Sequence, residues 1–313
     1  MTATTDATPE IGSAAVLSTR LSGSAAKLRR YSEDVYFRES FEQLCAQTED
    51  PTGFAYRHAI LLCKPDAVLG HVLDQTVSWL TDNGFRIVAA RRIRMTPHIV
   101  RAVWYFQWNA ASPERRLLAD LLGTLADALV LVVTRAGDAR PVSVELTERK
   151  GPTDPERRRP GQLRYELGRY GYLLNLVHST DEPADVIREL GIYFDRDERA
   201  ELFRSASRGV DRADAAQRLI DELYFGTPRR SLRFEDAARA IEAQAREILA
   251  EGPPRLAAEL RTSWATSAGD RTARLACFLR LAHRHRVSLD PWNVVVAGAA
   301  VFPMSEPGVK TLL

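Results

Sequence analysis

Polar side chains that could do chemistry stand at the ends of apolar runs in this chain. His178 ends one such run, and Lys64 directly follows another. A neutral imidazole is a nucleophile near pH 7, and lysine and arginine stabilise anionic oxygens. A histidine at a strand end is most often structural, but this one has polar neighbours in the sequence: Asn175, Thr180 and Glu189. This grouping favours a nucleophilic role for His178.

A loop rich in proline and arginine, residues 151–161, adds hydroxyl and cationic groups. Thr153 lies inside this loop, and several arginine and lysine side chains flank it. The run Arg157–Arg159 is as consistent with a solvated loop or a general anion-binding patch as with part of a site. His283 and His285 have no acidic or cysteine neighbour in the sequence, so we interpret them as surface residues.

The elements that must position these groups alternate between strands and helices. Apolar runs predict strands at 58–63, 85–95, 128–134 and 173–178. Helical spacing and capping residues predict helices at 72–80, 97–104, 113–125 and 181–194. This order fits an α/β (α+β) ferredoxin-like layout, in which an antiparallel sheet carries helices on one face.

Composition places the chain among ordinary globular proteins. Its 313 residues, 45% hydrophobic and 27% charged, suggest about two domains. A formal net charge of +2 argues against dedicated nucleic-acid binding. No apolar run reaches the length of a membrane span, no secretory signal is evident, and the 3 cysteines fit a reducing compartment. We therefore expect a cytoplasmic protein without a membrane partner.

Changes in composition divide the chain into segments. We expect a disordered tail at 1–30, an N-terminal extension at 31–53, the α/β domain at 54–200 and a mainly helical C-terminal domain at 201–313. Helical patterns in the last segment cover 211–223, 231–249 and 270–283. The run Trp292–Phe302 is apolar and β-prone, with no evident partner strand.

Several short motifs occur together in an order found in a known family. They are Lys64-Pro65-Asp66, the loop 151–155, the segment 160–164, the strand end 175–181, and Glu189 before Ile192-Tyr193-Phe194. The set resembles the nucleoside diphosphate kinases over about 58–198, slightly under half of the chain. The resemblance implies their fold for this segment, with the C-terminal helical region as an addition. It also implies a homo-oligomer, because family members assemble.

The resemblance implies a role for each matched residue. His178 matches the nucleophile whose Nδ1 takes the γ-phosphate of ATP or another nucleoside triphosphate and passes it to a nucleoside diphosphate. Glu189 matches the carboxylate that holds the other ring nitrogen, and Mg²⁺ is expected on the nucleotide phosphates. Lys64 matches the lysine that reaches the ribose hydroxyl and the transferred phosphate, which implies a catalytic role. The residues that match nucleotide ligands are Lys64, Tyr105 (or Trp104), Thr153, Arg164, Asn175, Thr180 and Asp181.

The departures from the family pattern lie around the phosphates. Thr147 stands where the family has a clamp arginine, and Arg149 is the candidate to replace it. These changes leave the acceptor open: a common nucleoside diphosphate or a specialised nucleotide. They also leave open an alternative function, a nucleotide-binding regulatory or interaction module with little or no turnover.

Overall fold

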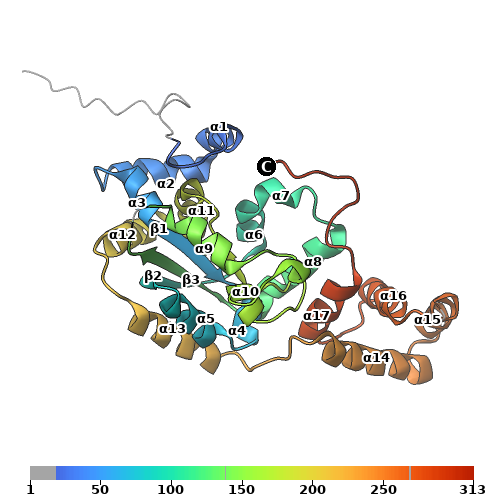
Figure 1. The fold of residues 1–313 in the computed structure, drawn as a ribbon. Helices are drawn as coiled ribbons and strands as arrows, with labels where there is room; N and C mark the ends of the chain where they lie inside the picture. The colour runs from blue at the N-terminus through green and yellow to red at the C-terminus, as the bar shows by residue number, and fades with distance from the viewer. Residues whose placement is uncertain (1–18, 138, 268) are drawn as a thin grey trace, which may run out of the picture.

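The computed structural model describes residues 19–137, 139–267 and 269–313 (Figure 1). Its centre is a four-stranded antiparallel sheet with strand order β2-β3-β1-β4. The strands are β1 (His58–Cys63), β2 (Phe85–Ile93), β3 (Ala128–Arg135) and β4 (Val177–Ser179). Strands that follow each other in the chain are not always neighbours, as in the split βαβ arrangement. This topology confirms the ferredoxin-like fold class.

The last strand is shorter than the predicted 173–178. The backbone of Leu176 has a φ of 68°, in the left-handed region that ends regular extended structure. Asp66 holds this bend, because its carboxylate accepts a hydrogen bond from the Leu176 amide at 2.9 Å. The Leu176 carbonyl in turn accepts from the amide of Lys64 at 2.9 Å. The Lys-Pro-Asp motif therefore fixes the path of the chain just before His178.

Helices cover both faces of the sheet, so the expectation of helices on one face is wrong. Leu61 and its neighbours on one face pack against α4 (Pro65–Leu69), α5 (Leu73–Asp82) and α13 (Ala213–Phe225). Ile60 and its neighbours on the other face pack in a second core, which also contains residues of α3 (Pro51–Arg57), α11 (Pro183–Tyr193) and α12 (Arg196–Ser207). The strand β1 is buried along its whole length for this reason.

The N-terminal segment is more ordered than expected. Residues 25–33 form α1 (Ala25–Glu33), followed by α2 (Val35–Cys45). Ser24 caps α1 by accepting a hydrogen bond from the Lys27 amide at 3.2 Å, and Leu21 is fully buried. The predicted disordered tail is therefore wrong for residues 21–30, and residues 1–18 lie outside the described part of the chain. Leu21 anchors this segment in the core, although most of its neighbours in the sequence are small or polar.

Local signals predicted the helices between the strands well. Thr96 and Ser112 cap α6 (Pro97–Val103) and α8 (Pro113–Leu125), where they accept from the third amide of each helix. The sequence did not predict the helices α7 (Tyr105–Trp108), α9 (Val142–Lys150) and α10 (Leu163–Glu166), or the 3₁₀ turn Pro155–Arg157. All of these lie close to the loops that carry the candidate site residues.

The C-terminal region is helical, as expected. Beyond α13 it contains α14 (Phe234–Glu251), α15 (Pro254–Thr266), α16 (Arg271–Arg284) and α17 (Pro291–Val301). The β-prone reading of Trp292–Phe302 is wrong, because this run forms α17. Asp290 caps the helix at the amide of Asn293, and neighbouring helices bury Trp292 and Val295. A short run that is apolar on every side cannot be assigned from periodicity alone.

The last residues turn back to the α/β domain and run along α7 (Figure 1). The amide of Glu306 donates to the Ala110 carbonyl at 2.9 Å, and the amide of Leu312 donates to the Phe106 carbonyl at 2.7 Å. These bonds connect the C-terminal region to the wall of the pocket described below. None of the helices in the described residues is long and apolar enough to cross a membrane.

Candidate active site

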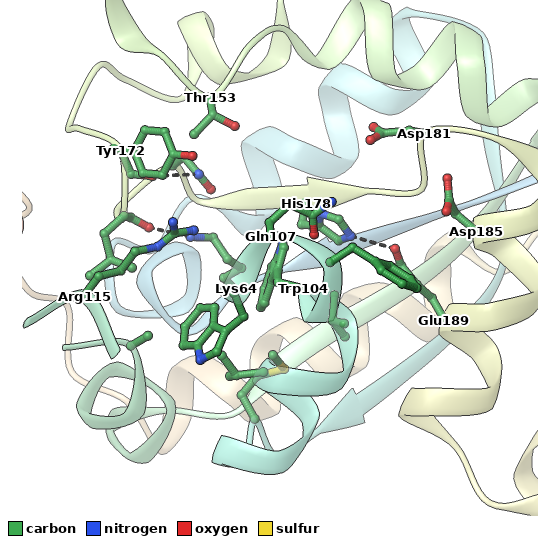
Figure 2. A pocket seen from close by; sticks show the side chains of 18 of the residues that line it. Lys64, Trp104, Gln107, Arg115, Thr153, Tyr172, His178, Asp181, Asp185 and Glu189 are labelled. Atoms are coloured by element: carbon green, nitrogen blue, oxygen red, sulfur yellow. Dashed lines mark hydrogen bonds and ion pairs between the residues drawn. The ribbon is translucent and has the colours of Figure 1, made fainter. Parts of the chain in front are cut away.

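A pocket of about 300 Å³ opens beside β4 and the helices α6 and α7 (Figure 2). Most of the residues that the sequence nominated line this pocket. They are Lys64, Thr153, Arg164, Asn175, His178, Asp181 and Glu189. The fold brings them together from four separate segments of the chain, which the sequence motifs alone could not demonstrate.

His178 lies on β4 and Glu189 on α11, and their side chains meet (Figure 2). Nε2 of His178 is 2.8 Å from Oε1 of Glu189. The other carboxylate oxygen accepts from the Tyr193 hydroxyl at 3.0 Å. Burial, together with the charge of Glu189, raises the pKa of Tyr193 well above its ordinary value, so this phenol stays protonated and donates. The hydrogen bond to Glu189 occupies Nε2 of His178, so Nδ1 is the ring nitrogen available for reaction.

Of the two neighbouring aromatic residues nominated from the sequence, Trp104 lines the pocket and Tyr105 does not. The indole of Trp104 lies edge-on to the imidazole of His178, with ring centroids 5.2 Å apart. Tyr105 is 57% exposed and does not line the pocket. The expectation that Tyr105 faces the site is therefore corrected, and Trp104 is the residue in that position. Consecutive residues at the junction of α6 and α7 point in different directions, which sequence register could not resolve.

Lys64 is held between the backbone and an acid. Its ammonium donates to the Leu173 carbonyl at 2.7 Å and is 3.4 Å from the carboxylate of Asp66. Burial lowers the pKa of Lys64, while the charge of Asp66 opposes this shift. Asn175 lies in the same loop as Leu173, where its side-chain amide donates to the Tyr172 carbonyl at 2.9 Å. The Lys-Pro-Asp motif thus organises the strand end that carries Asn175 and His178.

Arg164 joins the 151–161 loop to β4. Its guanidinium donates to the carbonyls of Gly151 and Val177 at 3.1 and 2.5 Å, and to the Thr153 hydroxyl at 3.2 Å. Burial lowers the pKa of Arg164 to about 10, so the guanidinium remains charged at neutral pH. This buried cation both fixes Thr153 and presents positive charge to the pocket.

The structure does not bring Arg149 or Thr180 to the pocket lining. Arg149 reaches the amide oxygen of Asn83 at 3.3 Å, and Thr180 accepts from the Ile60 amide at 3.0 Å in a fully buried position. Thr180 therefore ties β4 to β1, and its assignment as a nucleotide ligand is corrected. The expectation that Arg149 replaces the clamp arginine at Thr147 is likewise wrong, because its side chain reaches Asn83 at the end of α5 and not the pocket.

Further polar residues of the pocket have no individual role assigned from the sequence, although Lys150 is one of the cations that flank Thr153. They are Lys27, Arg115, Lys150, Tyr172, Asp185 and Arg188. Lys27 pairs with Asp185 at 2.9 Å although the two are 158 residues apart, so no local signal could have identified them. Arg115 lies one turn inside a predicted helix and packs over the Tyr172 ring at 5.0 Å. Lys150 directly precedes Gly151, the first residue of the 151–155 motif, and this position was the sequence signal that could have identified it.

The charge of the pocket favours an anionic ligand. Its cationic side chains are Lys27, Lys64, Arg115, Lys150, Arg164 and Arg188, and its acids are Asp181, Asp185 and Glu189. Partial burial opposes the ionisation of Asp181, but Lys150, His178 and the Thr147 hydroxyl together outweigh it and hold its pKa below the ordinary value. Within the described residues, no group of three or more histidine, cysteine or acidic side chains could hold a metal ion by itself. A divalent ion here would take most of its oxygens from a bound ligand.

Comparison with known proteins agrees with this geometry. Residues 57–199 match the sequence model of the family described as nucleoside diphosphate kinase. A nucleoside diphosphate kinase of Heliobacterium modesticaldum is 28% identical over 46% of this chain and 92% of its own length. Thioredoxin domain-containing protein 6 of Xenopus laevis is 30% identical over 48% of this chain and 24% of its own length.

The solved structure of the Aquifex aeolicus nucleoside diphosphate kinase is also similar. It has 23% identity and a TM-score of 0.37, covering 44% of this chain and 95% of the other. The sequence comparisons therefore show that residues 57–199 are similar to nucleoside diphosphate kinases. The N-terminal helices and the C-terminal helical region lie outside this match.

Proposed function

We propose that this chain is a phosphotransferase. It moves the γ-phosphate of ATP or another nucleoside triphosphate through a phosphohistidine to a nucleoside diphosphate or a specialised nucleotide acceptor. The observation that carries this proposal is the orientation of His178. Glu189 occupies Nε2 at 2.8 Å, and the remaining ring nitrogen belongs to a residue lining a cationic pocket.

The reaction consists of two in-line displacements at phosphorus. The lone pair on Nδ1 of His178 attacks the γ-phosphorus, the bond to the bridging oxygen breaks, and the nucleoside diphosphate leaves with that electron pair. Glu189 stabilises the positive imidazole while Nε2 keeps its proton. A terminal oxygen of the acceptor then attacks the phosphorus and the P–N bond breaks. Arg164 and Lys64 supply positive charge to the phosphate oxygens.

Mg²⁺ fits this site as an ion carried by the nucleotide. It would neutralise charge on adjacent phosphates. The acids of the pocket already have partners: Asp185 and Glu189 are engaged by Lys27 and His178, and Asp181 by Lys150 and the Thr147 hydroxyl.

One observation favours the alternative, a nucleotide-binding module with little turnover. Thr147 presents a neutral hydroxyl to Ser179 at 2.7 Å and to Asp181 at 3.0 Å, where the resemblance implies an arginine. A pocket with less positive charge would bind a triphosphate yet transfer its phosphate slowly.

The experiment that separates these functions is labelling with γ-labelled ATP and Mg²⁺, comparing the wild type with His178→Ala. We expect acid-labile, alkali-stable label that the variant lacks and that nucleoside diphosphates remove. Label that forms but resists a panel of common diphosphates would identify an unusual acceptor. Bound nucleotide without any label would refute the phosphotransferase and support the binding module.

A homo-oligomer remains a prediction of the resemblance. The outer strand β2 is engaged within the chain, because the amide of Arg212 donates to the Ile87 carbonyl at 2.8 Å. An assembly would therefore use surfaces other than this part of the sheet edge. Light scattering at micromolar concentration tests the prediction, and a monomer would contradict it.

A further inference from the structure

The cations of the pocket differ in how far nearby acids already neutralise them. Lys27 is 2.7 Å from Glu182, Arg188 is 2.9 Å from Asp34, and Lys64 is 3.4 Å from the fully buried Asp66. Because each of these cations is paired with an acid of the protein, the net electrostatic attraction that it exerts on an anionic ligand is weaker.

Lys150 is placed differently from these three cations. It is the last residue of α9, its side chain is only 6% exposed, and its ammonium donates to the Ser179 hydroxyl at 2.7 Å. Its acidic neighbour is Asp181, at 3.7 Å, with a side chain that is 63% exposed. A buried cation whose acid faces solvent is weakly compensated, which is unfavourable unless an anion joins it.

The position of this ammonium relates it directly to the nucleophile. Ser179 follows His178 on β4, and Lys150 and His178 line the same pocket. A lysine has three N–H donors; Lys150 directs one to the Ser179 hydroxyl at 2.7 Å and a second to the Thr147 hydroxyl at 3.5 Å, which leaves a third for a ligand. We propose that Lys150 stabilises the phosphoryl group carried by His178, supplying the positive charge that neither Thr147 nor Arg149 delivers. This inference rests on the proposed function and deepens it.

The electrostatics of Lys150 support the assignment. Burial, followed by the charge of Arg164, lowers its pKa to about 7, while Asp181 and Glu189 act in the opposite direction. A phosphate group near the ammonium would raise this pKa again, since an adjacent anion favours the charged form. Binding of a polyphosphate above pH 7 should therefore be coupled to proton uptake by Lys150.

The test compares Lys150→Met with Arg149→Met, the adjacent exposed cation outside the pocket. We expect the initial labelling rate of Lys150→Met to fall about 100-fold, as for removal of one charge-stabilising group, with partial recovery in Lys150→Arg. Arg149→Met should label at the wild-type rate. Lys150→Met should melt at or above the wild-type temperature at pH 7, because the substitution removes a buried charge. A lower melting temperature would indicate a structural role for Lys150. Wild-type labelling by Lys150→Met would overturn the proposal.

A second measurement uses the wild-type protein and does not depend on the variant folding. Calorimetric titration with ADP and Mg²⁺ at pH 8, in two buffers of different ionisation enthalpy, reports protons taken up on binding. Uptake supports the assignment, and no uptake overturns it. If the wild type takes no label at all, the phosphotransferase function fails and the role of Lys150 in transfer fails with it; this binding measurement then shows only whether Lys150 faces the phosphates of a bound nucleotide.

Discussion

Replacing Glu189 by glutamine should disable His178 by reversing the polarity of one hydrogen bond. The carboxylate now bridges Nε2 of His178 at 2.8 Å and the Tyr193 hydroxyl at 3.0 Å. The raised pKa of Tyr193 keeps that hydroxyl protonated, so it donates to whichever oxygen faces it. In Glu189→Gln the single amide oxygen should turn to Tyr193, which leaves the NH₂ group facing His178. Nε2 must then accept, and the ring proton moves to Nδ1, the atom that has to attack.

The size of the effect follows from the bond that is lost. A hydrogen bond to a charged group contributes about 1.5–3 kcal/mol, and each 1.36 kcal/mol is tenfold in rate. We therefore expect labelling of Glu189→Gln by γ-labelled ATP to slow roughly 10- to 160-fold. The side chain is only 7% exposed, so bulk water should not substitute for the lost contact.

A double variant tests the reasoning beyond the single result. Tyr193→Phe removes the donor that orients the amide, so Glu189→Gln combined with Tyr193→Phe should recover part of the lost rate. Initial labelling rates and melting temperatures are measured for both single variants and the double variant. Wild-type labelling by Glu189→Gln, or no recovery in a folded double variant, would refute the tautomer argument.

Further predictions concern the pocket and the core. Trp104→Ala should slow labelling about 2- to 12-fold, because it removes an aromatic contact with His178 of about 0.5–1.5 kcal/mol. Tyr105→Ala should label at the wild-type rate. If the two variants label at the same rate, the preference for Trp104 over Tyr105 is wrong. Arg164→Ala should weaken ADP binding by about 1.5–3 kcal/mol in calorimetry, and unchanged affinity would remove it from the site. Burial lowers the pKa of His58 below 6.5, so the unfolded chain takes up a proton that the native chain does not. The melting temperature should therefore fall as pH drops below about 6.5, and less steeply in His58→Phe; parallel profiles would contradict this.

Local signals in the sequence were sufficient for the order of the four strands and for the helices α5, α6, α8 and α11. The caps at Thr96 and Ser112 mark helix starts because a side-chain oxygen satisfies an amide only a few residues away. The apolar runs of β1 and β3 are unbroken because both strands are covered on both faces. His178 and Glu189 were paired by resemblance to a family, and the structure places them in contact.

Which side chains enter the pocket depended on contacts distant in sequence. Adjacent helical residues point about 100° apart, so whether Arg149 or Lys150 faces β4 is set by how α9 packs on the sheet. The run that forms α17 is helical because neighbouring helices bury it on several sides. Lys27 reaches the site through Asp185, a partner 158 residues away. Contacts between residues far apart in the sequence leave no periodic pattern or motif in the chain. Only the folded arrangement of the helices and the sheet therefore shows which side chains meet in the pocket.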